Sequence, residues 1–311
     1  MREIFVEKCN KEQSLLKYVL EIYPNLKYSV LQKALRNKDI RVNDKKISKD
    51  CLVRVGDKVN IYIHDYLLFD YPQNLEYVYI DENILAVYKP QGLLSNIEQY
   101  KDEESVEYKS VKIGGAEPTL ESLVKNDYKE AIICHRLDRN TAGIVLFALN
   151  NEAYDQLLNG FKNKCIKKEY IAYVSNAKFK CKNEVLENYI LKDKKTGYSS
   201  IYQKCVKNSQ KIITEYNVLS ANLKKDYAIL NILIPTGKTH QIRAQMKAIN
   251  HHIIGDSKYG INDVNKKFRV YKQLLFAYKY SFSFEKNSRL HYLNNIIISL
   301  DDKKYMKKLG D

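Results

Sequence analysis

The residues best placed to do chemistry form one run, 134–149, in which charged side chains directly precede an apolar strand. The run reads C-H-R-L-D-R-N-T-A-G-I-V-L-F-A-L, and its second part, 144–149, is apolar enough to cross the interior of a sheet. If the charged part is extended, Arg136 and Asp138 point to one side and Leu137 to the other. The pattern predicts an arginine and a carboxylate in one cleft, as a catalytic pair or an ordinary structural ion pair.

A second polar run, 235–246, reads P-T-G-K-T-H-Q-I-R-A-Q-M and predicts a turn followed by a helix. Gly237 permits a tight strand-to-helix turn, and Thr239 is a natural N-cap. We expect a buried stripe of Ile242, Met246 and Ile249, with His240, Arg243 and Lys247 on another side.

Five blocks of the chain, in order, resemble those of the RluA-type RNA pseudouridine synthases. H-R-L-D-R-N-T-A-G resembles the family's H-R-L-D-x-x-T-S-G, with Ala142 in place of the small hydroxyl residue. T-G-K-T-H-Q-I-R resembles T-G-R-x-H-Q-I-R, with Lys238 in place of an arginine and thus without its bidentate geometry. The others are 89–93, similar to K-P-x-G-L, 168–174, similar to K-x-Y-x-A-x-V, and 251–260, similar to H-P-I-x-G-D-x-x-Y-G.

The resemblance implies a role for several residues. Asp138 corresponds to the family's nucleophile, Arg243 to the arginine that pairs with it, and Tyr170 to the tyrosine against the target base, where it would stack and take the proton from C5. Arg136 would fill the space that the displaced nucleotide leaves. The other expected substrate-binding residues are His135, Thr141, Lys238, His240 and Gln241, of which His240 and Gln241 are scaffold rather than catalysts.

The implied reaction needs no cofactor. Turning uridine into pseudouridine breaks an N-glycosidic bond, rotates the base and rejoins it through carbon, without redox change or group donor. One ionised carboxylate suffices if a guanidinium offsets the cost of its burial. No metal is expected either, because the six cysteines form no C-x-x-C pair and the adjacent His251 and His252 lack a third ligand at suitable spacing.

The composition favours a globular protein with a polyanionic partner. Hydrophobic residues make up 45% and charged residues 29%, and the net charge is +15. Structured RNA is the expected partner, although a lysine-rich surface kept for solubility gives the same balance. No stretch approaches 18 apolar residues and no export signal is recognised, so we expect no membrane contact and a cytoplasmic location. We expect a monomer, although the sequence contains no signal for the oligomeric state.

The chain divides into three predicted parts: an N-terminal module at 1–66, a linker at 67–76 and a catalytic domain at 77–311. The module resembles the alpha-L RNA-binding motif, with a second helix that begins at a Ser29–Gln32 capping box. In this motif Lys33, Arg36, Lys38 and Arg41, assigned to that helix and the following turn, would contact RNA phosphates, and a solvated basic face is the alternative.

The expected fold is α+β, a pseudouridine-synthase-like, mostly antiparallel sheet with flanking helices, plus the small N-terminal α/β module. A helix over 152–161 should turn Leu157, Leu158 and Phe161 inward, and 295–300 should form a closing strand. Residues 96–118 are predicted to be a loop, and Asp256 a turn residue.

Two other functions are compatible with parts of the sequence. A non-catalytic RNA-binding assembly factor of the same ancestry predicts an eroded active site, yet Asp138, Tyr170 and Arg243 are all present. A two-carboxylate hydrolase needs a second acid in the cleft, for which Asp256 is the nearest candidate. If the chain is a pseudouridine synthase, the N-terminal module favours large-subunit ribosomal RNA over transfer RNA as substrate.

Overall fold

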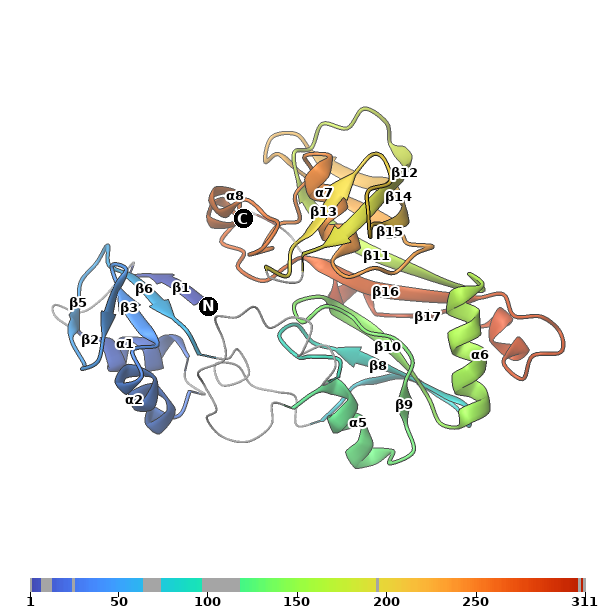
Figure 1. Cartoon of the computed structure of the whole chain (residues 1–311), viewed down its shortest axis with the longest axis horizontal. Helices are drawn as coiled ribbons and strands as arrows, with labels where there is room; N and C mark the ends of the chain where they lie inside the picture. Colours follow the sequence, from blue (N-terminus) through green and yellow to red (C-terminus); the bar gives the residue numbers. More distant parts are fainter. Residues whose placement is uncertain are drawn as a thin grey trace. The chain divides into compact units, whose positions relative to one another are not determined.

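The computed structural model describes residues 2–6, 13–23, 26–63, 74–96, 118–193, 196–306 and 309. They form two compact units, one made of the described residues within 1–73 together with Pro118, and one made of those within 74–103 and 119–311 (Figure 1). Most of the predicted linker 67–76 and of the predicted loop 96–118 lies outside the described residues. None of the helices in the described ranges is long and apolar enough to cross a membrane.

The first unit is a small antiparallel sheet packed against two helices. The sheet order is β1 (Arg2–Phe5), β6 (Lys58–Ile61), β3 (Ile40–Val42) and β4 (Lys45–Ile47), and a separate pair joins β2 (Gln13–Ser14) to β5 (Leu52–Val53). Helices α1 (Leu15–Ile22) and α2 (Tyr28–Arg36) turn their apolar faces to one core. Asn43 and Asp44, both at positive φ, form the turn between β3 and β4.

Two details of this unit differ from the sequence prediction. Helix α2 begins at Tyr28 after Lys27, which makes no side-chain cap, so Ser29 lies inside the first turn and the predicted capping box is wrong. Arg41 lies in strand β3 rather than in the turn after the helix, while Lys33 and Arg36 are exposed on α2 and Lys38 in the turn.

The second unit is organised around an eleven-stranded sheet. Its order is β13 (Ser199–Tyr202), β12 (Asn183–Lys192), β14 (Gln210–Asn222), β15 (Tyr227–Leu233), β11 (Ile166–Ser175), β16 (Leu275–Phe282), β10 (Ala142–Ala148), β8 (Ile84–Lys89) and β7 (Tyr77–Ile80). Strands β17 (Ile298–Ser299) and β9 (Ile132–Ile133) pair with β16 and β10. Only β10 and β16, among these described strands, pair in parallel, so the predicted mostly antiparallel α+β fold is confirmed.

The helices flank this sheet: α5 (Leu120–Asp127), α6 (Asn151–Lys162), α7 (Gln241–Ala248) and α8 (Asn262–Lys267), with 3-10 turns at His291–Asn295 and Asp302–Lys304. Helix α6 packs on β10 and β11, and α7 on β13 and β14 (Figure 1).

Three helix and strand predictions are corrected. Leu158 is exposed on α6, because only Ala153, Leu157 and Gly160 of that helix are fully buried. Helix α7 begins two residues after the predicted N-cap Thr239, and its N-cap is His240 in the left-handed region at φ 58°. The closing strand, expected over 295–300, is limited to Ile298–Ser299 because Asn295 ends a 3-10 turn.

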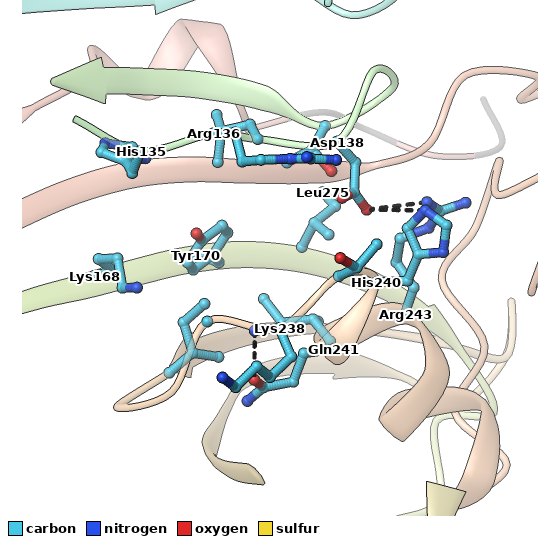
Figure 2. Close-up of a pocket in the computed structure, with 16 residues that line it drawn as sticks. His135, Arg136, Asp138, Lys168, Tyr170, Lys238, His240, Gln241, Arg243 and Leu275 are labelled. Atoms are coloured by element: carbon cyan, nitrogen blue, oxygen red, sulfur yellow. Dashed lines mark hydrogen bonds and ion pairs between the residues drawn. The ribbon is translucent and has the colours of Figure 1, made fainter. Parts of the chain in front are cut away.

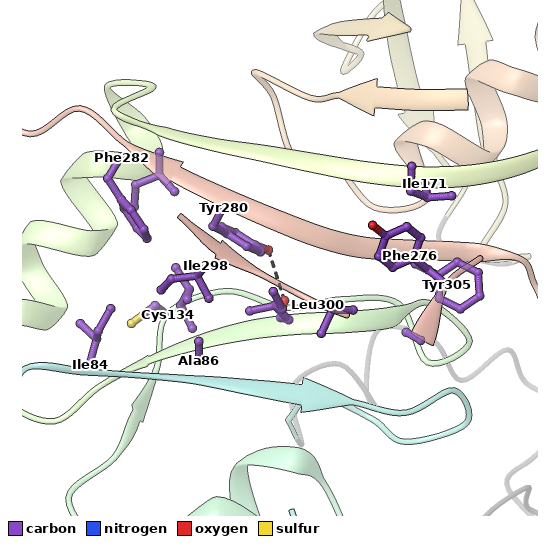
Figure 3. Close-up of a cluster of buried hydrophobic side chains, with 14 of the residues drawn as sticks. Ile84, Ala86, Cys134, Ile171, Phe276, Tyr280, Phe282, Ile298, Leu300 and Tyr305 are labelled. Atoms are coloured by element: carbon purple, nitrogen blue, oxygen red, sulfur yellow. Dashed lines mark hydrogen bonds between the residues drawn. The ribbon is translucent and has the colours of Figure 1, made fainter. Parts of the chain in front are cut away.

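The core of the second unit lies around β10, whose seven residues are all buried. Side chains from β8, β11, β16 and the C-terminal segment close over it (Figure 3). Within this cluster the Tyr280 hydroxyl donates to the Ile144 carbonyl at 3.3 Å, which satisfies a buried polar group. Strand β10 is therefore a fixed support for the polar loop that precedes it.

The parallel contact between β10 and β16 depends on Gly143. Its φ is +134°, and a Cβ atom there would lie 2.3 Å from the Ala277 carbonyl oxygen. Only glycine allows the two backbones to approach so closely.

We expect Gly143→Ala to lower the free energy of unfolding by about 3 kcal/mol or more, because it adds a backbone clash to an unfavourable φ. Gly92→Ala is the matched control: its φ is +91°, but no atom lies within 4 Å of the added Cβ, so backbone strain alone, about 1–2 kcal/mol, is expected. Urea unfolding measures both, and equal losses would contradict the close-approach argument.

Candidate active site

The loop that carries Asp138 is held in place by side chains from both of its sides. The ring of His135 accepts a hydrogen bond from the Leu146 backbone at Nε2 (3.0 Å) and packs against Phe161 and Tyr280. The Ser95 hydroxyl accepts from the backbone N–H of Leu137 and donates to its carbonyl, both at 3.0 Å. The residues on either side of Arg136 are thereby fixed.

A buried lysine, Lys89, holds the same loop through hydrogen bonds to backbone carbonyls. The Lys89 ammonium donates to the carbonyls of Pro90 (3.1 Å), Leu93 (2.7 Å) and Arg139 (3.0 Å), and the Gly92 N–H donates to Arg139 as well (2.8 Å). Lys89 is fully buried, so these bonds compensate for the desolvation of its charge. Residues 89–93 belong to a block that resembles the family, but no role was predicted for Lys89 or Ser95.

Asp138 meets Arg243, which extends from α7 (Figure 2). Nη1 of Arg243 lies 3.0 Å from Oδ2 of Asp138. The other side of the guanidinium is bound by Asp256, with Nε to Oδ2 at 2.7 Å and Nη2 to Oδ1 at 2.9 Å. Arg243 therefore bridges two carboxylates, in a fork geometry that lysine cannot reproduce.

Asp256 is more than the predicted turn residue. It is fully buried, and its Oδ1 also accepts from the backbone N–H groups of Lys258 (2.8 Å) and Tyr259 (2.9 Å). It does not line the pocket in which Asp138 lies. This geometry makes Asp256 a positioning residue for Arg243 and does not favour the two-carboxylate hydrolase.

The charges around Asp138 keep it ionised. Burial raises the pKa of its carboxyl, but the facing guanidinium groups of Arg243 and Arg136, with a hydrogen bond from Arg243, outweigh burial, so the pKa lies below the ordinary value of aspartate. Its Oδ1 accepts no hydrogen bond from any residue in the described ranges, whereas Oδ2 is held by Arg243. One oxygen of the carboxylate is thus fixed and the other available to a ligand.

His240 faces Asp138 from the start of α7. Its Nδ1 lies 3.0 Å from the Tyr259 hydroxyl, which itself accepts from the Ser199 N–H at 2.7 Å. The phenol proton is then available to Nδ1, and we infer a tautomer whose Nε2–H points to Oδ2 of Asp138, 4.0 Å away. Burial lowers the pKa of His240 to about 4, so the ring is neutral near pH 7.

Tyr170 is a buried phenol on β11. Burial, together with the charge of Asp138, raises the pKa of its hydroxyl above the ordinary value of tyrosine. The side chain is therefore protonated at neutral pH, which favours stacking on a base over removal of the C5 proton.

All nine candidate residues of this unit line one pocket of about 250 Å³ (Figure 2). They differ in what their polar atoms do. His135, as described, binds the β10 backbone; Thr141 accepts from Gln273 at 2.7 Å; and Gln241 bonds to Thr236, Lys238, Ile213 and Thr214. Arg136, Lys238 and His240 present polar groups to the pocket, and so does Lys168, the first residue of the 168–174 block, for which no role was predicted.

The four N-terminal candidates, Lys33, Arg36, Lys38 and Arg41, belong to the other unit. Lys33, Arg36 and Lys38 are exposed, and the Arg41 guanidinium lies 4.8 Å from the centre of the Tyr62 ring. A basic, partly aromatic face therefore surrounds the end of α2.

Comparisons with known proteins agree on one family. Residues 83–248 match the family model described as RNA pseudouridylate synthase. The "Ribosomal large subunit pseudouridine synthase C" of Rickettsia conorii is 30% identical over 283 residues, which cover 84% of this chain and 86% of the relative. An uncharacterized RNA pseudouridine synthase of Mycoplasma capricolum is 32% identical over 311 residues, covering 96% and 97%.

A solved structure shares the fold. "Human RNA Pseudouridylate Synthase Domain Containing 1" superposes with a TM-score of 0.57 at 21% identity, covering 74% of this chain and 84% of the human one.

The bridge between Arg243 and Asp256 predicts a loss of stability in Asp256→Asn. Breaking one side of a buried ion pair costs about 3–5 kcal/mol, and the retained contact with Asp138 places the expected loss near the lower value at pH 7. The pKa of Asp256 is lowered in the folded chain, so its contribution is present above the unfolded pKa of about 3.9 and fades as the pH falls through the folded value.

Urea unfolding of wild type and Asp256→Asn across this pH range measures the difference. Asp263→Asn, an exposed acid on α8, is the control and should change stability by less than about 0.5 kcal/mol. A loss in Asp256→Asn no larger than in the control would show that Asp256 does not hold Arg243.

Proposed function

This chain belongs to the RluA-type RNA pseudouridylate synthase family, the RNA uridine isomerases, and from that premise we propose that it modifies large-subunit ribosomal RNA with Asp138 as the nucleophile. The proposal that Asp138 is the nucleophile depends on one observation. Asp138 is an ionised carboxylate in a pocket, with Oδ2 held by Arg243 and Oδ1 available. A nucleophile needs this combination of charge, partial burial and fixed direction.

The proposed chemistry uses the residues of the pocket in sequence. The carboxylate of Asp138 bonds to C1′ as the C1′–N1 bond of the target uridine breaks with its electron pair on N1. The base turns, C5 bonds to C1′ and displaces the carboxylate, and the proton that C5 then loses is balanced by the proton that N1 takes up. Asp138 supplies the carboxylate for this exchange, and Arg243 keeps it charged and oriented. His240, neutral at this pH, contributes a hydrogen-bond donor beside Asp138 rather than a second charge.

Reaching the pocket requires the target nucleotide to leave its stack. Extrusion costs a few kcal/mol in a duplex and less in a loop. We propose that Arg136, which lines the pocket and precedes Asp138 by two positions, occupies the vacated position by stacking and phosphate contact. The phenol of Tyr170 would then stack on the extruded uracil.

Two features support ribosomal RNA as substrate. The Rickettsia relative is named as a large-subunit ribosomal enzyme, and the alignment with it covers most of both chains. The N-terminal unit adds a basic face around the end of α2, which suits the phosphate backbone of a large structured RNA. We propose that this unit supplies affinity and the pocket supplies the choice of uridine.

Tritium release tests the reaction and its nucleophile. With RNA labelled at C5 of uridine, wild type should release tritium from unmodified large-subunit ribosomal RNA, and Asp138→Asn should be slower by on the order of a thousandfold or more, since the nucleophile is lost. Asp263→Asn serves as the control with full activity, and unmodified transfer RNA as the control substrate.

Tritium release from transfer RNA alone would show that transfer RNA, not ribosomal RNA, is the substrate. Full activity of Asp138→Asn would remove Asp138 from the chemistry. If wild type releases no tritium from either RNA but still binds RNA in a salt-sensitive way, the result would favour a non-catalytic assembly factor.

The N-terminal unit yields a separate prediction about salt dependence. Replacing Lys33, Arg36, Lys38 and Arg41 by glutamine should weaken RNA binding and flatten the slope of log Kd against log salt by about 0.7–0.9 for each phosphate that the variant no longer neutralises. Filter binding at several salt concentrations measures the slope.

The control is a second quadruple glutamine variant with the same change in charge. It uses exposed lysines of the other unit: Lys178, Lys180, Lys182 and Lys286. If both variants change the slope equally, net charge rather than the face around α2 accounts for the affinity.

A further inference from the structure

Lys168 lies in the same pocket as Asp138 and Tyr170, yet the chemistry described above does not use it. It precedes Tyr170 by two positions on β11, so both side chains leave the strand toward the pocket (Figure 2). The residue between them, Glu169, is bound instead by Lys279 (2.9 Å) and Asn231 (2.9 Å).

Among the described residues, no carboxylate lies within ion-pair distance of the Lys168 ammonium. Its Nζ lies 5.3 Å from the centre of the Phe161 ring, and a Cβ atom on Gly237 would come within 3.0 Å of it, so the ammonium rests against bare backbone. The pocket also contains basic residues that cannot neutralise Lys168, among them the cations Arg136 and Lys238 and the buried, neutral His135.

A charge in this position makes the folded chain less stable. Burial lowers the pKa of Lys168 to about 8, well below the ordinary value of lysine, because no anion compensates for the lost water. A methionine would fill the same volume without that penalty. Groups of this kind are typical of sites where the missing partner arrives with the substrate.

The position of Lys168 relative to Asp138 indicates which part of the substrate it meets. Lys168 and the Asp138–Arg243 pair lie on opposite sides of Tyr170 in Figure 2. A uracil stacked on Tyr170, with its ribose carbon at Asp138, directs its ribose-distal carbonyl toward Lys168. Breaking the C1′–N1 bond leaves the electron pair on N1, and the negative charge spreads to both carbonyl oxygens.

The same contact can persist when the base turns. Exchanging N1 for C5 requires a half-turn about the axis through N3 and C6, and this half-turn also exchanges O2 with O4. The carbonyl distal to the ribose is therefore O4 before the turn and O2 after it. One fixed donor meets the distal carbonyl in both orientations.

We propose that Lys168 is a catalytic residue whose ammonium donates a hydrogen bond to the ribose-distal carbonyl of the uracil and stabilises the detached, negatively charged base. The assignment rests on the proposed function, because it needs the C1′–N1 bond to break in this pocket. Preorganised donors at sites of developing charge typically accelerate reactions by about 100- to 1,000-fold.

Single-turnover tritium release with excess enzyme tests the assignment, on unmodified large-subunit ribosomal RNA labelled at C5 of uridine. Lys168→Met should lower the maximal rate by about 100-fold while RNA affinity stays unchanged and the Tm stays equal or rises. Lys168→Arg, which keeps the charge, should recover part of the rate. Lys167→Met is the matched control: it removes the same charge from an exposed neighbour on β11 and should retain the wild-type rate.

Three results would overturn the assignment. The first is a wild-type maximal rate in Lys168→Met with normal binding. The second is weaker, less salt-dependent binding at an unchanged maximal rate, which would make Lys168 a phosphate contact. The third is a lower Tm with no recovery by arginine, which would make it structural. Absence of release by wild type as well as by Asp138→Asn would instead refute the proposed function, and this assignment with it.

Discussion

The arrangement of the pocket depends on one guanidinium held between two carboxylates. Arg243 is buried, and a buried arginine that remains charged needs anionic partners. Asp256 satisfies it from behind with two hydrogen bonds, which leaves Nη1 directed at Asp138. The three groups together carry one negative charge, so the pocket contains an ionised carboxylate whose position is set by the protein before RNA arrives.

That interaction works only if the two sides of the pocket are fixed independently. The side of Asp138 is fixed by Ser95, Lys89 and the β10 backbone, which contact the loop at Leu137, Arg139 and through His135. The side of Arg243 is fixed by the left-handed His240 and the side-chain bonds of Gln241 at the start of α7. Because most of these bonds are buried, each side is rigid, and the ion pair joins two rigid parts rather than ordering a flexible one.

The strands and the main residues of the pocket could be predicted from the sequence, because the patterns that indicate them lie within short segments. The period of the strands, the buried run that became β10 and the blocks around Asp138, Tyr170 and Arg243 are readable from neighbouring residues, and the structure brings these three together in one pocket. The start of α7 was misplaced because a left-handed histidine is rare at that position, and local rules favour threonine as the cap.

Supporting residues escaped prediction for a different reason: their partners are distant in sequence and their types are common at surfaces. Lys89 binds the carbonyl of Arg139, and nothing in the intervening residues indicates that contact. The chain has 52 lysines and arginines, and residue type alone does not show which of them is buried. Asp256 follows a glycine, as turn residues do, and only the folded chain shows that it faces Arg243.

Four basic residues in and around the pocket fall into two groups, according to which groups neutralise their charge. Lys89 and Arg243 are satisfied by the protein itself, through carbonyls and carboxylates, and they hold the pocket together. Lys168 and Lys238 have no carboxylate partner in the described part of the chain, and both line the pocket. A charge already satisfied contributes to folding, whereas a charge left without an anion destabilises the free protein and gains its partner from a negatively charged substrate.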